Sequence, residues 1–351
     1  MNLIETLKLN KPRFVIYGAQ VVACGAYTAI HHLCGCTPEF FAVSSLENNP
    51  NDIDGIQVRP YEFIPKDVLI VVAVTELLQD AIVSHLKTKG YEKIFILTQN
   101  EEHILMSEYF KSIGKFQSAI EFENYSEFPS DFVLYEVRNH RDKELSYPPE
   151  LMSYEKTIQA GAGITDIKIA DITDDTGINI SEKNKMYCEL TATYWVWKNT
   201  NHSWCGIEHY RRHLLVESDM FNVADAILPL PYICYPNTLA QFRRFVNEDV
   251  CDLLLRALKD LHPDKYDEYM KILYGNYQYT YNIFCAKKEI FDDYCAWFFN
   301  ITEYIEKISS DFPVIKETRA LSYVAEVLTN LYFMSNTNKI KIIHAPKRIF
   351  V

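Results

Sequence analysis

The stretch Trp204-Cys-Gly-Ile-Glu-His-Tyr-Arg-Arg-His213 decides how the second half of this chain is interpreted. Its first five residues predict a short strand, so that His209, Arg211 and Arg212 follow at the carboxyl end of that strand. Open α/β sheets bind ligands at this end. Adjacent guanidinium groups are rigid forks of donors that suit phosphate oxygens. We expect Arg211 and Arg212 to neutralise a diphosphate, and His209 to donate a hydrogen bond to it or to a sugar.

A less specific interpretation of the same stretch is a surface cluster of ion pairs, in which the two arginines face Glu208 and Glu217. The chain has no D-x-D sequence after residue 131, and Asp52-Ile-Asp54 lies in an expected turn of the first half. Many enzymes that handle nucleotide sugars hold a metal with D-x-D, so the arginines could take over the metal's role. We expect no cofactor, with a divalent metal left as an open alternative.

An aromatic-rich helix is expected over residues 182–199, with Asn179 or Ser181 as its cap. Tyr194, Trp195 and Trp197 are flat apolar groups that could stack on a sugar ring or a base. The same side chains could instead belong to the core. Either role, stacking on a ligand or packing in the core, favours a helix packed beside the predicted strand.

Two glutamates are candidate catalytic groups. Glu189 shares one face of the expected helix with Thr193 and Trp197, at i, i+4 and i+8. Glu326 lies in a mostly apolar helical stretch, where burial raises the pKa of a carboxyl toward neutrality and suits it to act as a general base. A solvated Glu189, and a structural pairing of Glu326 with Arg319, are the alternatives. Asp174 and Asp175 are candidates for binding hydroxyl groups, although both could simply form a turn.

The first half alternates expected strands and helices, which predicts a parallel, doubly wound, Rossmann-like domain over residues 1–118. The turn Gly18-Ala-Gln-Val-Val-Ala-Cys-Gly25 occupies the place of a phosphate-binding loop. Gln20 stands where a dinucleotide-binding loop needs a second glycine, which argues against NAD. A Rossmann oxidoreductase therefore remains only a third alternative. A second α/β domain is expected over residues 131–351.

Composition excludes several classes of protein. The 351 residues carry a net charge of −12, which argues against nucleic acid as a partner. Nine scattered cysteines without C-x-x-C spacing predict free thiols in a reducing cytoplasm, with no metal held by them. No run of 18 apolar residues is present, so we expect a cytoplasmic protein, with peripheral contact at the inner face of the plasma membrane left open.

From about residue 132 onward, the chain resembles a bacterial domain family of long-unknown function found in capsule and lipopolysaccharide synthesis loci. Beside the stretch that ends at Arg212, the resemblance rests on these segments: Gln159-Ala-Gly-Ala-Gly163, Asp174-Asp-Thr-Gly-Ile-Asn-Ile-Ser181, Tyr187-Cys-Glu-Leu-Thr-Ala192, Tyr194-Trp-Val-Trp-Lys-Asn199, Tyr281-Asn-Ile-Phe284 and Lys287-Lys-Glu-Ile-Phe-Asp-Asp-Tyr-Cys295. The loop Asn139-His-Arg141 takes the place of the family's usual Thr-His-Lys-like loop.

The resemblance implies a GT-A-like glycosyltransferase domain, and some family members are regarded as galactofuranosyltransferases. It implies a nucleotide-sugar donor and a glycan or lipid-linked glycan acceptor in surface-polysaccharide assembly. It also adds His140 and Asn282 to the expected substrate-binding residues. Around Glu326 the chain reads Ala325-Glu326-Val327, where the family pattern resembles Ser-Glu-Arg. This difference favours, as an alternative, a module that binds a nucleotide sugar or glycan without turnover.

Overall fold

The smaller sheet of the protein is built from the first hundred residues, and its neighbours pair in parallel except for one edge strand. The computed structural model describes residues 3–118, 127–309 and 319–351. The strand order is β3-β4-β2-β1-β5-β6. The strands are β1 Phe14–Tyr17, β2 Phe41–Val43, β3 Asp52–Ile53, β4 Ile56–Pro60, β5 Leu69–Val72 and β6 Ile94–Ile96.

Helices pack on this sheet, as expected for strands whose side chains are buried on both faces. The helices are α1 Leu3–Asn10, α2 Val21–Cys34, α3 Glu76–Thr88 and α4 Gln99–Ser112. Residues of β1 and β5 alternate between two apolar clusters: Phe14 and Ile16 pack with α2 and α4, whereas Val15 and Tyr17 pack toward α3. The α/β class predicted from the alternation of strands and helices is confirmed.

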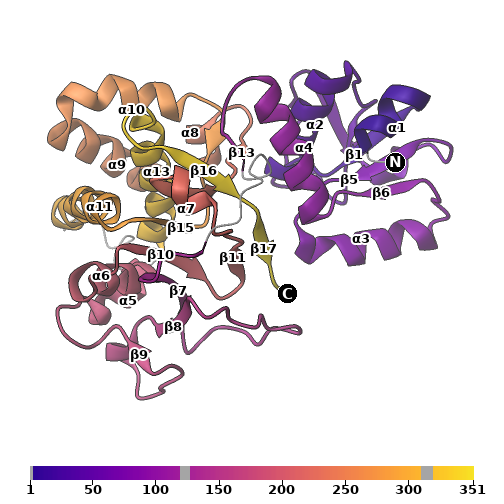
Figure 1. Cartoon of the computed structure of the whole chain (residues 1–351). Helices are drawn as coiled ribbons and strands as arrows, with labels where there is room; N and C mark the ends of the chain where they lie inside the picture. Colours follow the sequence, from indigo (N-terminus) through magenta and orange to yellow (C-terminus); the bar gives the residue numbers. More distant parts are fainter. Residues whose placement is uncertain (1–2, 119–126, 310–318) are drawn as a thin grey trace.

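The larger sheet is mixed, with the order β16-β12-β15-β10-β7-β8-β9 (Figure 1). Strand β10 pairs in parallel with β7, which in turn pairs in parallel with β8, while β15 runs antiparallel to β10. Strand β11 pairs with β10 at the carboxyl end of β10, and β17 pairs with β11. The strands are β7 Phe132–Arg138, β8 Glu155–Gln159, β9 Ile172–Thr173, β10 Trp204–His209, β11 Arg212–Leu214, β12 Ala226–Pro229, β15 Phe284–Lys287, β16 Ile342–Ala345 and β17 Lys347–Ile349.

One face of the larger sheet is covered by helices. Val133, Tyr135 and Val137 of β7 join the large apolar cluster with α9, α11 and α13, whereas Phe132 and Leu134 face the other side. A two-stranded sheet of β13 Tyr232–Ile233 and β14 Tyr277–Gln278 completes the domain. The helices are α5 Asn184–Tyr187, α6 Leu190–Asn199, α7 Met220–Val223, α8 Thr238–Phe242, α9 Glu248–Leu261, α10 Tyr266–Leu273, α11 Lys288–Ile308 and α13 Ala320–Ser335.

The helix expected over residues 182–199 is interrupted, and that part of the prediction is wrong. Cys188 has a φ of +49°, which ends α5 before α6 begins. The Asn184 amide donates to the Cys188 carbonyl oxygen over 2.7 Å and to Thr191 Oγ1 over 3.0 Å. The first of these bonds satisfies a carbonyl oxygen that a continuous helix would have paired with a backbone N–H. As a result, Glu189 lies at the start of α6 instead of in the middle of one long helix.

The two sheets are joined through side chains that the sequence did not identify. Arg244 Nη1 donates to Gln20 Oε1 over 2.7 Å, and Gln20 Nε2 donates to Asn49 Oδ1 over 2.8 Å. Tyr232 and Ile233 of β13 belong to the apolar cluster of the smaller sheet. The Gln20 side chain, which replaces a glycine of the dinucleotide-binding pattern, therefore forms part of the contact between the two halves. No helix among the described residues is long and apolar enough to cross a membrane.

The closeness of β10 and β15 gives a first prediction. A Cβ on Gly206 would lie 2.4 Å from Cys285 Cβ and 2.5 Å from the Phe284 carbonyl oxygen. Because both neighbours belong to a buried strand, Gly206→Ala should lower the free energy of unfolding by about 3 kcal/mol or more. Urea denaturation would measure the loss. In the control Gly25→Ala, the new Cβ meets only the flexible Met106 side chain, so an equal loss in both variants would contradict this account.

Candidate functional site

A cavity of about 510 Å³ opens where three parallel strands of the larger sheet end. Arg138 closes β7, Ala160 follows β8, and His209 closes β10. The predicted strand before His209 is present as β10, and its carboxyl end forms one wall of the cavity. The opposite wall comes from the break between α5 and α6, where Cys188 and Glu189 lie.

Cationic side chains dominate the lining. Six lysines and arginines line the cavity against two carboxylates, those of Asp142 and Glu189. This excess of positive charge suits an anionic ligand, although the chain as a whole is acidic. The six cationic residues are Arg138, Arg141, Lys143, Lys185, Arg211 and Arg319.

Arg138 is held in place by a buried carboxylate. Its Nη2 and Nε donate to the two oxygens of Glu136 over 2.8 and 2.9 Å. Burial alone would raise the pKa of Glu136, but polar interactions with the nearby His213 ring, Arg138 and Thr157 lower it to about 2. The Glu136 carboxylate is therefore ionised and fixes the Arg138 guanidinium at the cavity wall. Arg138 was not among the site residues expected from the sequence, although its position directly after a buried strand could have indicated a role in the site.

His209 lines the cavity as a neutral imidazole. Burial, followed by the charges of Arg212, Arg211 and Arg319, lowers its pKa to about 3. A neutral ring still carries one N–H donor, so a hydrogen bond from His209 to a ligand is compatible with this state. Its Nδ1 atom is buried and has no hydrogen-bond partner among the described residues.

Arg211 and Arg212 are separated by the geometry of a hairpin. Tyr210 and Arg211 form the turn between β10 and β11, and His209 pairs with Arg212 across it. Arg211 lines the cavity and stacks on Tyr210, with its Cζ 4.9 Å from the ring centre. Arg212 is not among the residues that line the cavity, because its Cζ lies 4.3 Å above the Tyr281 ring. The two guanidinium groups thus do not form one fork.

Glu189 joins the cavity to a buried hydrogen-bond network. Asn282 Nδ2 donates to Glu189 Oε1 over 3.1 Å, and Ser322 Oγ donates to the same oxygen over 2.9 Å. Asn282 also accepts a bond from Thr329 over 3.2 Å. Both donors to Glu189 bind one oxygen, so neither bond involves Oε2. The carboxylate is held firmly while its residue lines the cavity.

Glu326 lies in the same region but does not line the cavity. Its Oε1 accepts a hydrogen bond from the Tyr281 backbone N–H over 3.2 Å. Burial, reinforced by the charge of Glu189, raises the pKa of Glu326 to about 7, against the opposing influence of Arg212 and Arg319. The structure thus brings Glu189, Asn282, Arg212 and Glu326 together, with Glu189 nearest the open space.

The three aromatic residues of α6 lie outside the cavity lining. Trp197 stacks on Phe299 with ring centres 5.6 Å apart, and Tyr194 meets the same ring edge-on at 4.9 Å. Trp195 Nε1 donates to the Thr176 carbonyl oxygen over 3.0 Å. They pack against the large apolar cluster instead of facing a ligand there, which corresponds to the core alternative.

Asp174, Asp175 and His140 were also expected to bind substrate, and none of them lines the cavity. Asp174 is fully buried, and its carboxylate accepts the backbone N–H groups of Gly161 and Ala162 over 2.8 and 2.9 Å. Asp175 pairs with Lys168 over 2.7 Å. His140 Nε2 accepts a bond from Arg141 over 3.2 Å, while its Nδ1 has no partner in the described parts of the chain. Asp174 therefore orders the loop that follows β8.

Fold and cavity together define an α/β protein with a cation-lined pocket at the carboxyl ends of parallel strands. The chain belongs to the family described as "Domain of unknown function (DUF4422)", whose model matches residues 137–338. This agrees with the family resemblance seen in the sequence. No curated protein gives a significant match.

The fold resembles a solved structure described as the apo structure of WbbM, a bifunctional glycosyltransferase. The TM-score is 0.53 and the sequence identity 23%. The similarity covers 63% of this chain and 45% of that one, so the chain matches less than half of the WbbM structure.

The raised pKa of Glu326 gives a second prediction. The folded protein holds the Glu326 proton more tightly than the unfolded chain does, so ionisation of Glu326 reduces stability as the pH rises from 4.5 to about 7. A glutamine stays neutral and keeps an oxygen that can accept the Tyr281 N–H. The difference between the melting temperature of Glu326→Gln and that of the unmodified protein should therefore increase as the pH rises through this window. Above the window, this difference should stay constant.

Thermal melts of both proteins between pH 4 and 9 would measure this difference. Glu150→Gln, at an exposed loop position, is the matched control and should follow the unmodified protein at every pH. Parallel curves for Glu326→Gln and the unmodified protein would contradict the burial of this carboxyl.

Proposed function

We propose that the protein is a glycosyltransferase that moves a sugar from a nucleoside-diphosphate donor to a hydroxyl group of a glycan. The cation-lined cavity carries this proposal, because it sets six lysines and arginines around an open space beside a fixed carboxylate. Membership of the DUF4422 family and the fold shared with WbbM, itself described as a bifunctional glycosyltransferase, support it.

The cationic wall would stabilise the leaving group. When the bond between sugar and diphosphate breaks, negative charge builds up on the phosphate oxygens, and fixed donors around that position lower the barrier. Arg138 and Arg211 lie at the ends of neighbouring parallel strands, and Arg319 lines the same cavity. His209 would add one neutral donor. In this arrangement side chains alone supply the positive charge.

Glu189 is the better placed of the two candidate carboxylates. It lines the cavity, and its bonds from Asn282 and Ser322 keep it in one orientation. We assign to Glu189 contact with the acceptor hydroxyl or with the reacting sugar. Glu326, behind it, would act as a positioning residue, because it holds the Tyr281 backbone next to Asn282. A base at Glu189 corresponds to an inverting reaction.

The acceptor follows from the family resemblance rather than from the cavity. We place the reaction in surface-polysaccharide assembly, for a capsule, an exopolysaccharide or an O-antigen, with galactofuranose as the first sugar to test. The acceptor would be a glycan or a lipid-linked glycan met at the inner face of the plasma membrane. A panel of nucleotide sugars with such acceptors tests this assignment, and binding without turnover across the panel would favour the non-catalytic alternative.

A third prediction concerns the donor diphosphate. Arg211→Ala should weaken binding of the nucleoside diphosphate at least about tenfold, because a charge-assisted bond to phosphate is lost. Calorimetry with the free diphosphate would measure the change without requiring turnover. The control Arg256→Ala removes an exposed arginine of α9 that pairs with Asp260, and this variant should bind normally. Equal affinities in the two variants would remove Arg211 from the donor site.

A fourth prediction separates chemistry from binding. Glu189→Gln keeps an oxygen for Asn282 and Ser322, so the fold and the affinity for the donor should be retained. The rate constant kcat for transfer should fall by about 100-fold or more, as expected when a general base is lost. A kcat for Glu189→Gln equal to that of Glu150→Gln would show that the reaction does not use this carboxylate.

A further inference from the structure

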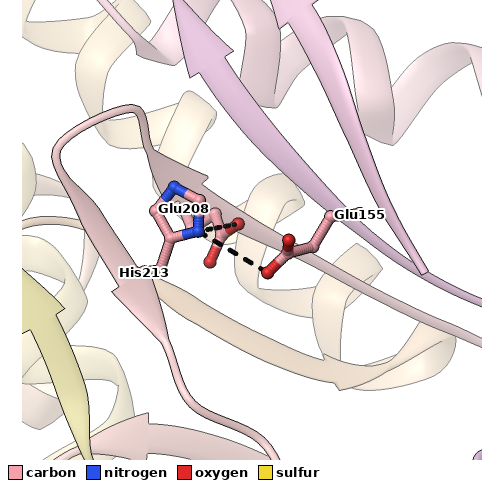
Figure 2. A group of neighbouring side chains, drawn as sticks. All are labelled: Glu155, Glu208 and His213. Atoms are coloured by element: carbon pink, nitrogen blue, oxygen red, sulfur yellow. Dashed lines mark ion pairs between the residues drawn. The ribbon is translucent and has the colours of Figure 1, made fainter. Parts of the chain in front are cut away.

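A second charged group lies on the other face of the larger sheet, away from α9, α11 and α13. Glu155 begins β8, Glu208 is the last residue but one of β10, and His213 is the central residue of β11. Figure 2 shows the two carboxylates converging on one nitrogen of the His213 ring. The exposed fractions of the three side chains are 5%, 0% and 4%, so water does not solvate them appreciably.

The hydrogen bonds leave this group incomplete. Glu155 Oε2 accepts the Met152 backbone N–H over 2.7 Å, and Glu208 Oε2 accepts the Leu214 backbone N–H over 3.0 Å. The other oxygen of each carboxylate faces His213 Nδ1, at 3.6 Å for Glu155 and 3.3 Å for Glu208. Glu208 Oε1 and His213 Nε2 have no hydrogen-bond partner within the described residues, although both are buried. One ring nitrogen carries at most one proton and cannot bond both oxygens well.

These nitrogen–oxygen distances are long for hydrogen bonds. They are close to the separation of two donor atoms that bind the same metal ion. A tetrahedral ion with ligands at about 2.0–2.1 Å holds neighbouring donor atoms about 3.3–3.5 Å apart. The three candidate donor atoms lie within 4.8 Å of one another. One imidazole and two carboxylates are donors that divalent first-row metals accept. The cysteine spacing that argued against a thiolate site does not bear on this set of donors.

Glu136 completes the surroundings of the group. Its Oε1 lies 3.7 Å from His213 Nε2, on the side of the ring opposite the two other carboxylates. A carboxylate behind a metal-bound histidine orients the ring and increases the basicity of its other nitrogen. Arg138 already balances the charge of Glu136. A doubly charged cation would balance Glu155 and Glu208 in the same way, whereas His213, their ion-pair partner, carries at most one positive charge.

We propose that Glu155, Glu208 and His213 bind one divalent transition-metal cation of the Zn²⁺ class. The ion would join β8, β10 and β11 beneath the cavity. The hairpin between β10 and β11 carries Tyr210 and Arg211 at its turn, so the ion would hold that turn at the cavity wall. This metal site does not depend on the proposed transfer reaction.

The test uses the full chain stripped of metal with a chelator. Calorimetry with ZnCl₂ should give one saturable site per chain, and the melting temperature should rise with Zn²⁺ concentration. Co²⁺ should give the visible absorption of a four-coordinate ion with nitrogen and oxygen donors, without a thiolate charge-transfer band. Glu208→Gln should abolish the site, and Glu136→Gln should weaken it about 10- to 100-fold.

One control tests for binding elsewhere, and a further ligand variant provides a backup. The double change Cys34→Ser with Cys36→Ser removes the closest pair of partly exposed thiols and should leave the affinity for Zn²⁺ unchanged. Glu155→Gln is a second ligand variant, used if Glu208→Gln does not fold. Absence of a one-to-one site in the unmodified chain, or a site that survives the loss of a ligand but not of the thiols, would overturn the proposal.

Discussion

The parallel pairing of β10 with β7 is the constraint on which the rest of the structure depends. Its register matches Trp204 with Phe132 at one end and His209 with Val137 at the other. Both strands therefore end at the same edge, which brings Arg138 beside the His209 turn and creates the cation-lined cavity. Gly206 permits the close approach of β15 on the other side of β10. If β10 slipped by one residue against β7, the side chain of Glu208 and those of its apolar neighbours would exchange faces of the sheet.

Successive side chains of β7 point to opposite faces of the sheet, and the two faces differ in chemical character. Tyr135 and Val137 enter the helix-covered core, whereas Leu134 and Glu136 face the opposite side. The cationic groups lie at the carboxyl ends of the strands. The buried carboxylates lie on the face of the sheet opposite the helix-covered core. Arg138 belongs to both regions, because it lines the cavity while binding Glu136. Arg138, one of the six cationic residues of the cavity, is thus held by a carboxylate that solvent does not reach.

Much of this arrangement could be predicted from local sequence. The α/β class followed from alternating apolar segments, and the strand that ends at His209 followed from its composition. The break at Cys188 could not be predicted, because it depends on the Asn184 side chain donating to the Cys188 carbonyl oxygen. The core packing of Trp197 depends on Phe299 in a distant helix. The group around His213 requires the pairing of three strands, which no local pattern of residues reveals.

The strand β17 is the yellow element that ends beside the larger sheet in Figure 1. It pairs with β11, and the Phe350 N–H donates to the Arg211 carbonyl oxygen over 2.8 Å. Phe350 also meets the His213 ring edge-on at 5.0 Å. During translation, these residues leave the ribosome long after the hairpin that they hold. The pocket wall is therefore completed only after β17 has been synthesised, and nascent polypeptides that stall before β17 would carry every side chain of the cavity without its final support.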